Sequence, residues 1–222
     1  MNLIEHYYLF DGVLSFGVEI VRPENSNMKI LIRNLKSVQL TIILAFICFL
    51  SLGGCSKYSK EIQANLTKLK KTKACSGCDL SGIELISFDL KGADLSGANL
   101  TGANLKRSDL SEANLIDTNL TDADLLGLNL TGATLTNTNL TGVKLSYSNI
   151  NGADISGAVL KDAHMNSSKV VNSKIRNSDM TGANLHNADL TGTKVSKETL
   201  KDAVLCKTVM PSGQQDDSGC KR

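Results

Sequence analysis

The chain has 222 residues, a formal net charge of +2 at pH 7, no Trp and only 4% aromatic residues. This length suffices for one domain with a leader segment. The near-neutral charge argues against a partner recruited by overall charge, such as nucleic acid, and the scarcity of aromatic residues indicates a core filled by aliphatic side chains.

The first 54 residues are interpreted as a leader. Residues 1–27 match neither a targeting segment nor a domain, and we interpret them as a start-site artefact or a disordered extension, with translation beginning at Met28. A basic segment, Met28–Lys36, precedes an apolar run, Leu40–Leu52, which ends in Leu52-Gly53-Gly54-Cys55. This order of basic, apolar and small residues before a Cys resembles a bacterial lipoprotein signal peptide with its lipobox.

The resemblance implies that residues 28–54 are removed and that Cys55 becomes an acylated N-terminus. Several acyl chains would hold the protein firmly on a bilayer, in the bacterial cell envelope and facing the periplasm or the exterior. Ser56 after the Cys favours the outer membrane, by resemblance to Gram-negative sorting. The alternatives are a buried core helix and an uncleaved transmembrane helix, which normally needs about 20 apolar residues.

Residues 55–74 are polar and basic, and we expect a tether followed by a short capping helix. Ile62, Leu66 and Leu69 recur at helical spacing, with lysines at positions 60, 68, 70, 71 and 73. Such an amphipathic helix can cover the N-terminal mouth of a repeat domain. Contact of its basic side with anionic lipid is a second interpretation.

A five-residue period organises residues 75–205. The central residue of each pentad is aliphatic or Met, the residue two places earlier is usually small, and the residue before the centre is usually Asp or Asn. This period fits neither a helix nor a plain strand, but it fits a chain that turns a corner every five residues. Four steps would close a square coil of about 20 residues, stacked on the next at about 4.8 Å.

The motif A-(D/N)-L-x-x, as in Ala93-Asp94-Leu95-Ser96-Gly97, resembles the pentapeptide-repeat family. The resemblance implies an all-β fold, a right-handed quadrilateral β-helix of about 6.5 coils. Residues 20 apart would then form interior columns, and Glu198 at an interior site indicates that the last coil opens into a cap. One expected core ladder consists of Leu80, Leu100, Leu120, Leu140 and Leu160.

Four cysteines follow the lipobox: Cys75, Cys78, Cys206 and Cys220. An even number outside the cytoplasm indicates disulfides, whereas four cysteines could also bind zinc. About 6.4 coils, or roughly 30 Å, separate Cys78 from Cys206, so we expect local pairs, Cys75–Cys78 and Cys206–Cys220. The second pair would close a C-terminal cap over residues 206–222. A redox-active Cys-x-x-Cys would need a thioredoxin-like context that the sequence does not indicate.

Stacked polar side chains are the remaining candidates for chemistry. The pairs are His164 with His186 and Asp89 with Asp109, and the column is Asn99, Asn119 and Asn139. The histidines are expected to face outward on one side, the aspartates could bind a cation loosely, and the asparagines favour a hydrogen-bonded ladder. We predict no catalytic residue, no metal site and no cofactor.

These features predict a non-enzymatic, lipid-anchored module of the bacterial cell envelope with a structural or protein-interaction role. Its partners would be the membrane, through the anchor, and other envelope proteins, with no nucleic acid and no small-molecule substrate. The alternative is a DNA mimic, because some pentapeptide-repeat proteins resemble B-form DNA and bind type II topoisomerases, giving quinolone resistance. That role needs an acidic face and a cytoplasmic location, whereas acidic residues between Asp79 and Leu130 give way to basic residues further along.

Overall fold

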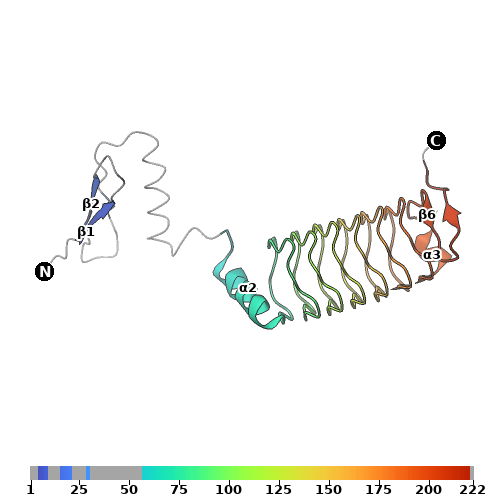
Figure 1. Ribbon diagram of the computed structural model, residues 1–222, viewed down its shortest axis with the longest axis horizontal. Coiled ribbons are helices and arrows are strands. Elements are labelled where there is room, and N and C mark those ends of the chain that lie inside the picture. Colours follow the sequence, from blue (N-terminus) through green and yellow to red (C-terminus); the bar gives the residue numbers. More distant parts are fainter. Residues whose placement is uncertain (1–4, 10–15, 22–28, 31–56, 221–222) are drawn as a thin grey trace. The chain divides into compact units, whose positions relative to one another are not determined.

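The computed structural model describes residues 5–9, 16–21, 29–30 and 57–220, in two units, Met1–Lys57 and Tyr58–Arg222 (Figure 1). The first unit contains strands β1 (Glu5–Leu9), β2 (Phe16–Val21) and β3 (Lys29–Ile30), paired antiparallel in that order. Aromatic and β-branched residues favour these strands, although the sequence indicated no domain there. Most of the expected signal peptide, and Cys55 with it, lies outside the described residues. No helix within the described residues is both long and apolar enough to span a bilayer.

The second unit begins with helix α2 (Lys60–Thr72). The helix starts after Ser59, whose Oγ accepts a hydrogen bond from the Ile62 amide at 3.2 Å and satisfies one free donor of the first turn. Leu69 is fully buried, and Ile62 and Leu66 are partly buried against the core. The apolar face of α2 therefore packs on the first coil, which is the geometry of a capping helix.

From residue 74 the chain coils with a register of 20 residues. The residues before the pentad centres pair in parallel with the residues 20 positions later, from Ala74 with Asp94 to Asp189 with Val209; Asp179 is an exception, because Thr199 lies in a helix. Only one pairing lengthens into regular strands, β4 (Lys174–Ile175) with β5 (Lys194–Val195), within the described coils. Figure 1 shows the coils stacked in one direction. Each side of a coil is too short for more, because a corner follows every fifth residue.

The pentad centres fill the interior. Leu80, Leu100, Leu120, Leu140 and Leu160 are each at most 1% exposed. Residues at the small site share this interior, and its three larger aliphatic members are buried as well: Ile83, Leu128 and Val143. Phe88, the largest, is only partly buried and packs at the core margin. A buried Leu side chain contributes roughly 1.5–3 kcal/mol, so the ladder dominates the stability of the stack.

Hydroxyl groups at the small site have a role that the pattern of small residues did not reveal. The buried Thr138 Oγ1 donates to the carbonyl of Leu115, 23 residues earlier, at 2.7 Å. The same step recurs at Ser108, Thr118, Ser148, Ser173, Ser178, Thr193 and Thr208. These bonds connect one coil to the next within the buried interior, which we call the bore. An unpaired polar group there would lower the stability of the fold.

The corners need left-handed backbone two residues after each pentad centre. Gly142 adopts φ +65°, and a Cβ added there would collide with the Asp122 carboxylate one coil earlier. Asp122 and Tyr147 occupy equivalent corners with φ of 55° and 60°. Glycine is favoured at such positions because it lacks a Cβ, and Asp or Asn tolerate them.

The C-terminal end departs from the pattern and then returns to it. Helix α3 (Lys197–Leu200) replaces a corner and leaves Glu198 exposed. The register resumes where Val204 pairs with Asn184, and it continues to Val209. The coil thus extends past Leu205, the boundary expected from the sequence, because the pentad beyond it places a buried Thr208 at the small site.

A disulfide lies at each end of the stack. Cys75 is joined to Cys78 beside α2, and Cys206 is joined to Cys220 at the far end; these are the two local pairs expected from the sequence. The second bridge holds strand β7 (Gln215–Asp216) antiparallel to β6 (Thr208–Val209). Strand β7 pairs with backbone of the last coil that would otherwise be open to edge-to-edge association.

Candidate interaction surface

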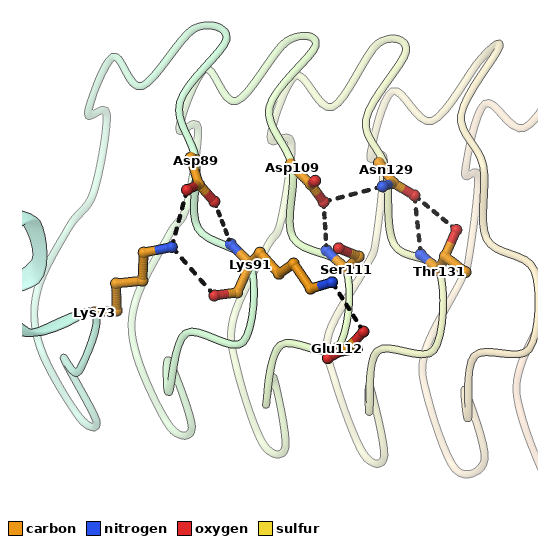
Figure 2. Close-up of polar contacts among 8 residues, drawn as sticks. All are labelled: Lys73, Asp89, Lys91, Asp109, Ser111, Glu112, Asn129 and Thr131. Carbon is orange, nitrogen blue, oxygen red and sulfur yellow. Dashed lines mark hydrogen bonds and ion pairs between the residues drawn. The ribbon is translucent and has the colours of Figure 1, made fainter.

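The residues before the pentad centres form one outward column on each face of the coil stack. Figure 2 shows one of them, the acidic column, which we define as Asp89, Asp109 and Asn129. Asp109 Oδ1 accepts hydrogen bonds from the Ser111 amide at 2.8 Å and from Asn129 Nδ2 at 3.0 Å in the next coil. Backbone pairing thus places these side chains one above the other at the strand spacing of about 4.8 Å.

Both carboxylates of the acidic column are held in their charged form. Hydrogen bonds from Ser111 lower the pKa of Asp109, with the charge of Asp89 opposing the effect. The Lys91 amide and the Lys73 ammonium lower the pKa of Asp89, and Lys73 Nζ lies 3.0 Å from Asp89 Oδ2. Because Lys73 neutralises Asp89, the pair does not present two free carboxylates to a cation. Among the described residues, no group of three His, Cys, Asp or Glu could hold a metal ion.

The asparagine column differs from the expected ladder. Asn119 Oδ1 accepts from both the amide and the hydroxyl of Thr121, at 3.1 and 2.6 Å, and Asn139 is bonded in the same way to Thr141. Asn99 additionally donates to the Asp79 carboxylate in the coil before it, at 3.1 Å. The amide oxygens are thus engaged within their own corners, two residues away, which stabilises each turn locally.

A second face carries a shallow depression of mixed charge. Lys106 Nζ lies 2.9 Å from Asp124 Oδ2 at its edge, and the other lining residues are Leu126, Lys144, Ser146 and His164. His164 pairs by backbone with Asn184, so His186 lies in the adjacent coil, offset by two residues. His164 is exposed and His186 half-buried. Small-molecule sites bury most of their ligand. This depression is too open to do so, and it is better suited to contact with the surface of another macromolecule.

The far end of another face is basic. Lys174 and Lys194 are paired neighbours in β4 and β5, and Asp154 neutralises Lys174 at 3.0 Å. Arg176 and Lys194 line an open hollow beside α3. The sign of charge therefore changes along the stack from the acidic column to this end, as the sequence indicated.

The comparison with known families decides the identity of the coil. The protein-family model described as pentapeptide repeats matches this chain with eight copies, over residues 75–111, 89–127, 125–162, 138–182 and 160–196. The chain belongs to the pentapeptide-repeat family. Membership implies the right-handed quadrilateral β-helix that the sequence predicted, and it accounts for the 20-residue register of the stack.

Several solved pentapeptide-repeat structures are similar to this chain. HetL of Nostoc sp. strain PCC 7120, a protein involved in heterocyst differentiation regulation, is 22% identical over 72% of this chain and 100% of its own, with a TM-score of 0.30. Rfr23 of Cyanothece 51142 is 28% identical over 61% of this chain and 96% of its own, with a TM-score of 0.36. QnrB1, a plasmid-mediated fluoroquinolone resistance protein, is 19% identical over 66% and 80%, with a TM-score of 0.26. No curated protein matches the chain significantly.

Proposed function

We propose that this pentapeptide-repeat chain is a non-enzymatic protein-interaction module, anchored in the bacterial cell envelope by lipid on Cys55. It faces the periplasm or the exterior. The observation that carries the proposal is a disulfide at each end of the stack, together with the Leu52-Gly53-Gly54-Cys55 sequence upstream. The lipobox supplies an export signal and a membrane attachment in one segment.

The disulfides support the location. Structural disulfides persist in oxidising compartments and are rare in the cytosol. Within the described residues no cysteine is free, so the cysteines there suit export. The bridge Cys206–Cys220 closes a loop with a sequence separation of 14, for which chain entropy contributes about 3 kcal/mol. This stabilisation would be lost in a reducing compartment.

The exterior of the stack supports an interaction role. Its charged side chains stand at fixed positions on a hydrogen-bonded frame, so a partner meets a preorganised surface that costs little ordering on binding. The acidic column and the basic end around Arg176 and Lys194 give the surface opposite charges at separate places. Such a pattern favours orientation and selection of a partner more than raw affinity.

Metabolic labelling tests the anchor. Cells expressing the full chain are fed an alkyne fatty acid, and the purified protein is examined for label. The full chain and the Cys48→Ala variant should carry label, and Cys55→Ala should carry none. The control matters because Cys48 lies in the same apolar segment. Absence of label in all three chains, or equal label in Cys55→Ala, would remove the anchor from the proposal.

Crosslinking in intact cells tests the interaction role. A photoreactive residue at Lys144, which is exposed in the depression of mixed charge, should give discrete adducts with envelope proteins. The same residue at Leu145, in the buried interior, should give none. Adducts only with cytoplasmic proteins would contradict the proposal, and gyrase inhibition by the mature chain in a supercoiling assay would revive the DNA-mimic alternative.

A further inference from the structure

Helix α2 presents a basic face directed away from the coil stack. Lys60, Lys68 and Lys71 are exposed, and at 3.6 residues per turn they lie within an arc of about 80°. The buried Leu69 lies on the opposite side of the helix and packs on the first coil. Figure 1 shows α2 at the N-terminal end of the stack. We call these three lysines the basic face of α2.

Two other lysines of this region contact residues of the coil stack. Lys70 Nζ lies 5.8 Å from the centre of the Phe88 ring, and Lys73 pairs with Asp89. The ion pairs of the described residues involve none of the lysines of the basic face. Glu61 is exposed at the edge of this face, but it forms no ion pair with the three lysines within the described residues. The face therefore carries three lysines against one carboxylate and is positive on balance.

The position of the basic face in the chain limits how far it can lie from a lipid on Cys55. Lys60 lies five positions after Cys55, and an extended chain spans at most about 3.6 Å per residue. The start of α2 would therefore lie within about 18 Å of the acylated residue. Electrostatic attraction to anionic headgroups extends about one Debye length, or roughly 8–10 Å, so this reach allows contact.

The chemistry of the face fits a planar, charged partner. Ala64 and Thr67 lie between the lysines and are also exposed. Protein-binding hot spots are enriched in Trp, Tyr and Arg that fill pockets, whereas this face offers ammonium groups on long stems above small residues. Each lysine near an anionic membrane strengthens binding roughly five-fold.

We propose that the basic face of α2 lies on anionic phospholipid headgroups, so that the coil stack projects from the membrane with the Cys206–Cys220 end outermost. The proposal rests on the lipid anchor proposed above for its biological setting. The anchor fixes the distance to the bilayer, and the basic face fixes the orientation. The charged surfaces of the stack would then be held clear of the membrane for partners.

Vesicle binding without lipidation tests the basic face directly. Residues 55–222 carrying Cys55→Ser contain the whole compact second unit with its core and both disulfides, and circular dichroism verifies their folding. At low salt this chain should bind vesicles containing phosphatidylglycerol and should not bind phosphatidylcholine vesicles. Lys60→Gln, Lys68→Gln and Lys71→Gln together should weaken partitioning roughly 100-fold.

A matched variant separates the basic face from net charge. Gln at Lys144, Lys161 and Lys169, all exposed on the stack, removes the same charge and should leave partitioning nearly unchanged. Equal losses in both triple variants, or no binding of the parent chain to anionic vesicles, would overturn the proposal. Since this chain carries no acyl group, the result does not depend on whether Cys55 is acylated in cells.

Orientation is tested on the lipidated protein in anionic vesicles. A fluorophore on Thr67 of the basic face should be quenched by a headgroup-attached quencher, and one on Ser212 in the C-terminal cap should not. Equal quenching at the two positions would overturn the orientation. A photoreactive residue at Thr67 should crosslink to lipid, and a protein adduct there in place of lipid would overturn the choice of partner.

Discussion

Two adjacent leucines in the middle of the stack provide the sharpest test of the coil as a packed bore. Leu125 is a pentad centre and is fully buried. Leu126 is the next residue, is only half-buried, and lines the depression of mixed charge. We predict that Leu125→Ala is strongly destabilising and that Leu126→Ala is nearly tolerated, although the two substitutions remove the same atoms.

The expected loss of unfolding free energy depends on how far the interior of the stack can close around the cavity left by the substitution. The Leu125 amide donates to the Lys144 carbonyl in the next coil at 2.9 Å, and the Asp124 amide donates to the Ala103 carbonyl in the preceding coil at 2.8 Å, so both neighbouring coils hold the wall in place. Buried Leu→Ala substitutions cost about 2.7–5.0 kcal/mol, with the larger values where the site cannot collapse. We therefore expect about 3–5 kcal/mol for Leu125→Ala and about 1 kcal/mol or less for Leu126→Ala.

The assay is urea denaturation of oxidised residues 55–222 carrying Cys55→Ser, followed by circular dichroism. The change in unfolding free energy is taken from the midpoint at constant slope. Retention of two-state behaviour is checked first, because a break in the middle of a repeat stack can uncouple its halves. Equal costs for the two variants, or a cost below about 1 kcal/mol for Leu125→Ala, would refute the claim that pentad centres fill a rigid interior.

Three further results are expected on the same chain. Thr138→Val should lower the unfolding free energy by about 1–3 kcal/mol, because the Leu115 carbonyl loses its hydroxyl donor, while Thr138→Ser should restore most of it; equal effects would contradict the inter-coil bond. Hydrogen bonds from Ser96 and Ser111 hold the pKa values of Asp94 and Asp109 below 3.8. Stability gained from them is present above that pH and is lost as pH falls through the folded-state values. A double Asp→Asn variant, which keeps an accepting oxygen, should therefore show a shallower acid titration of stability below about pH 4 than the parent, and an unchanged titration would refute the role of these carboxylates. Cys206→Ser with Cys220→Ser should cost up to about 3 kcal/mol and raise amide exchange mainly at Val209 and Met210, whereas uniform exchange along the stack would show that the bridge does not act locally.

The five-residue period predicted the architecture because it reports directly on the geometry of the bore. A large aliphatic residue such as Leu100 at every pentad centre and a small residue two places earlier leave one solution, an interior shared by one large and one small side chain. Family membership confirms that solution. The cysteine pairs could also be predicted from the sequence, because the stack keeps Cys78 far from Cys206.

What the pattern could not specify depends on hydrogen-bond direction and on the ends. Ala, Ser and Thr are equivalent by size, so the donation from Thr138 to an earlier coil was not visible in the sequence. Asn119 was expected to bond along its column, but the Thr121 amide and hydroxyl lie closer to its oxygen. The coil continues beyond Leu205 because α3 absorbs an irregular corner and returns the chain to register.

The lysines of α2 show a similar limit. Helical spacing predicted an amphipathic helix, but the division between Lys70, which lies over Phe88, and the outward basic face depends on how the helix packs on the first coil. That division is the basis for the proposed membrane orientation, because the lysines of the basic face point away from the stack, whereas Lys70 lies over Phe88 and Lys73 pairs with Asp89.

The intact mass of the protein extracted from membranes tests at once whether the leader is removed, Cys55 is acylated and the disulfides form. We predict a single species of residues 55–222 with acyl groups on Cys55 and with both disulfides formed. An unmodified chain that still contains residues 28–54, or a chain with four free thiols, would contradict this prediction.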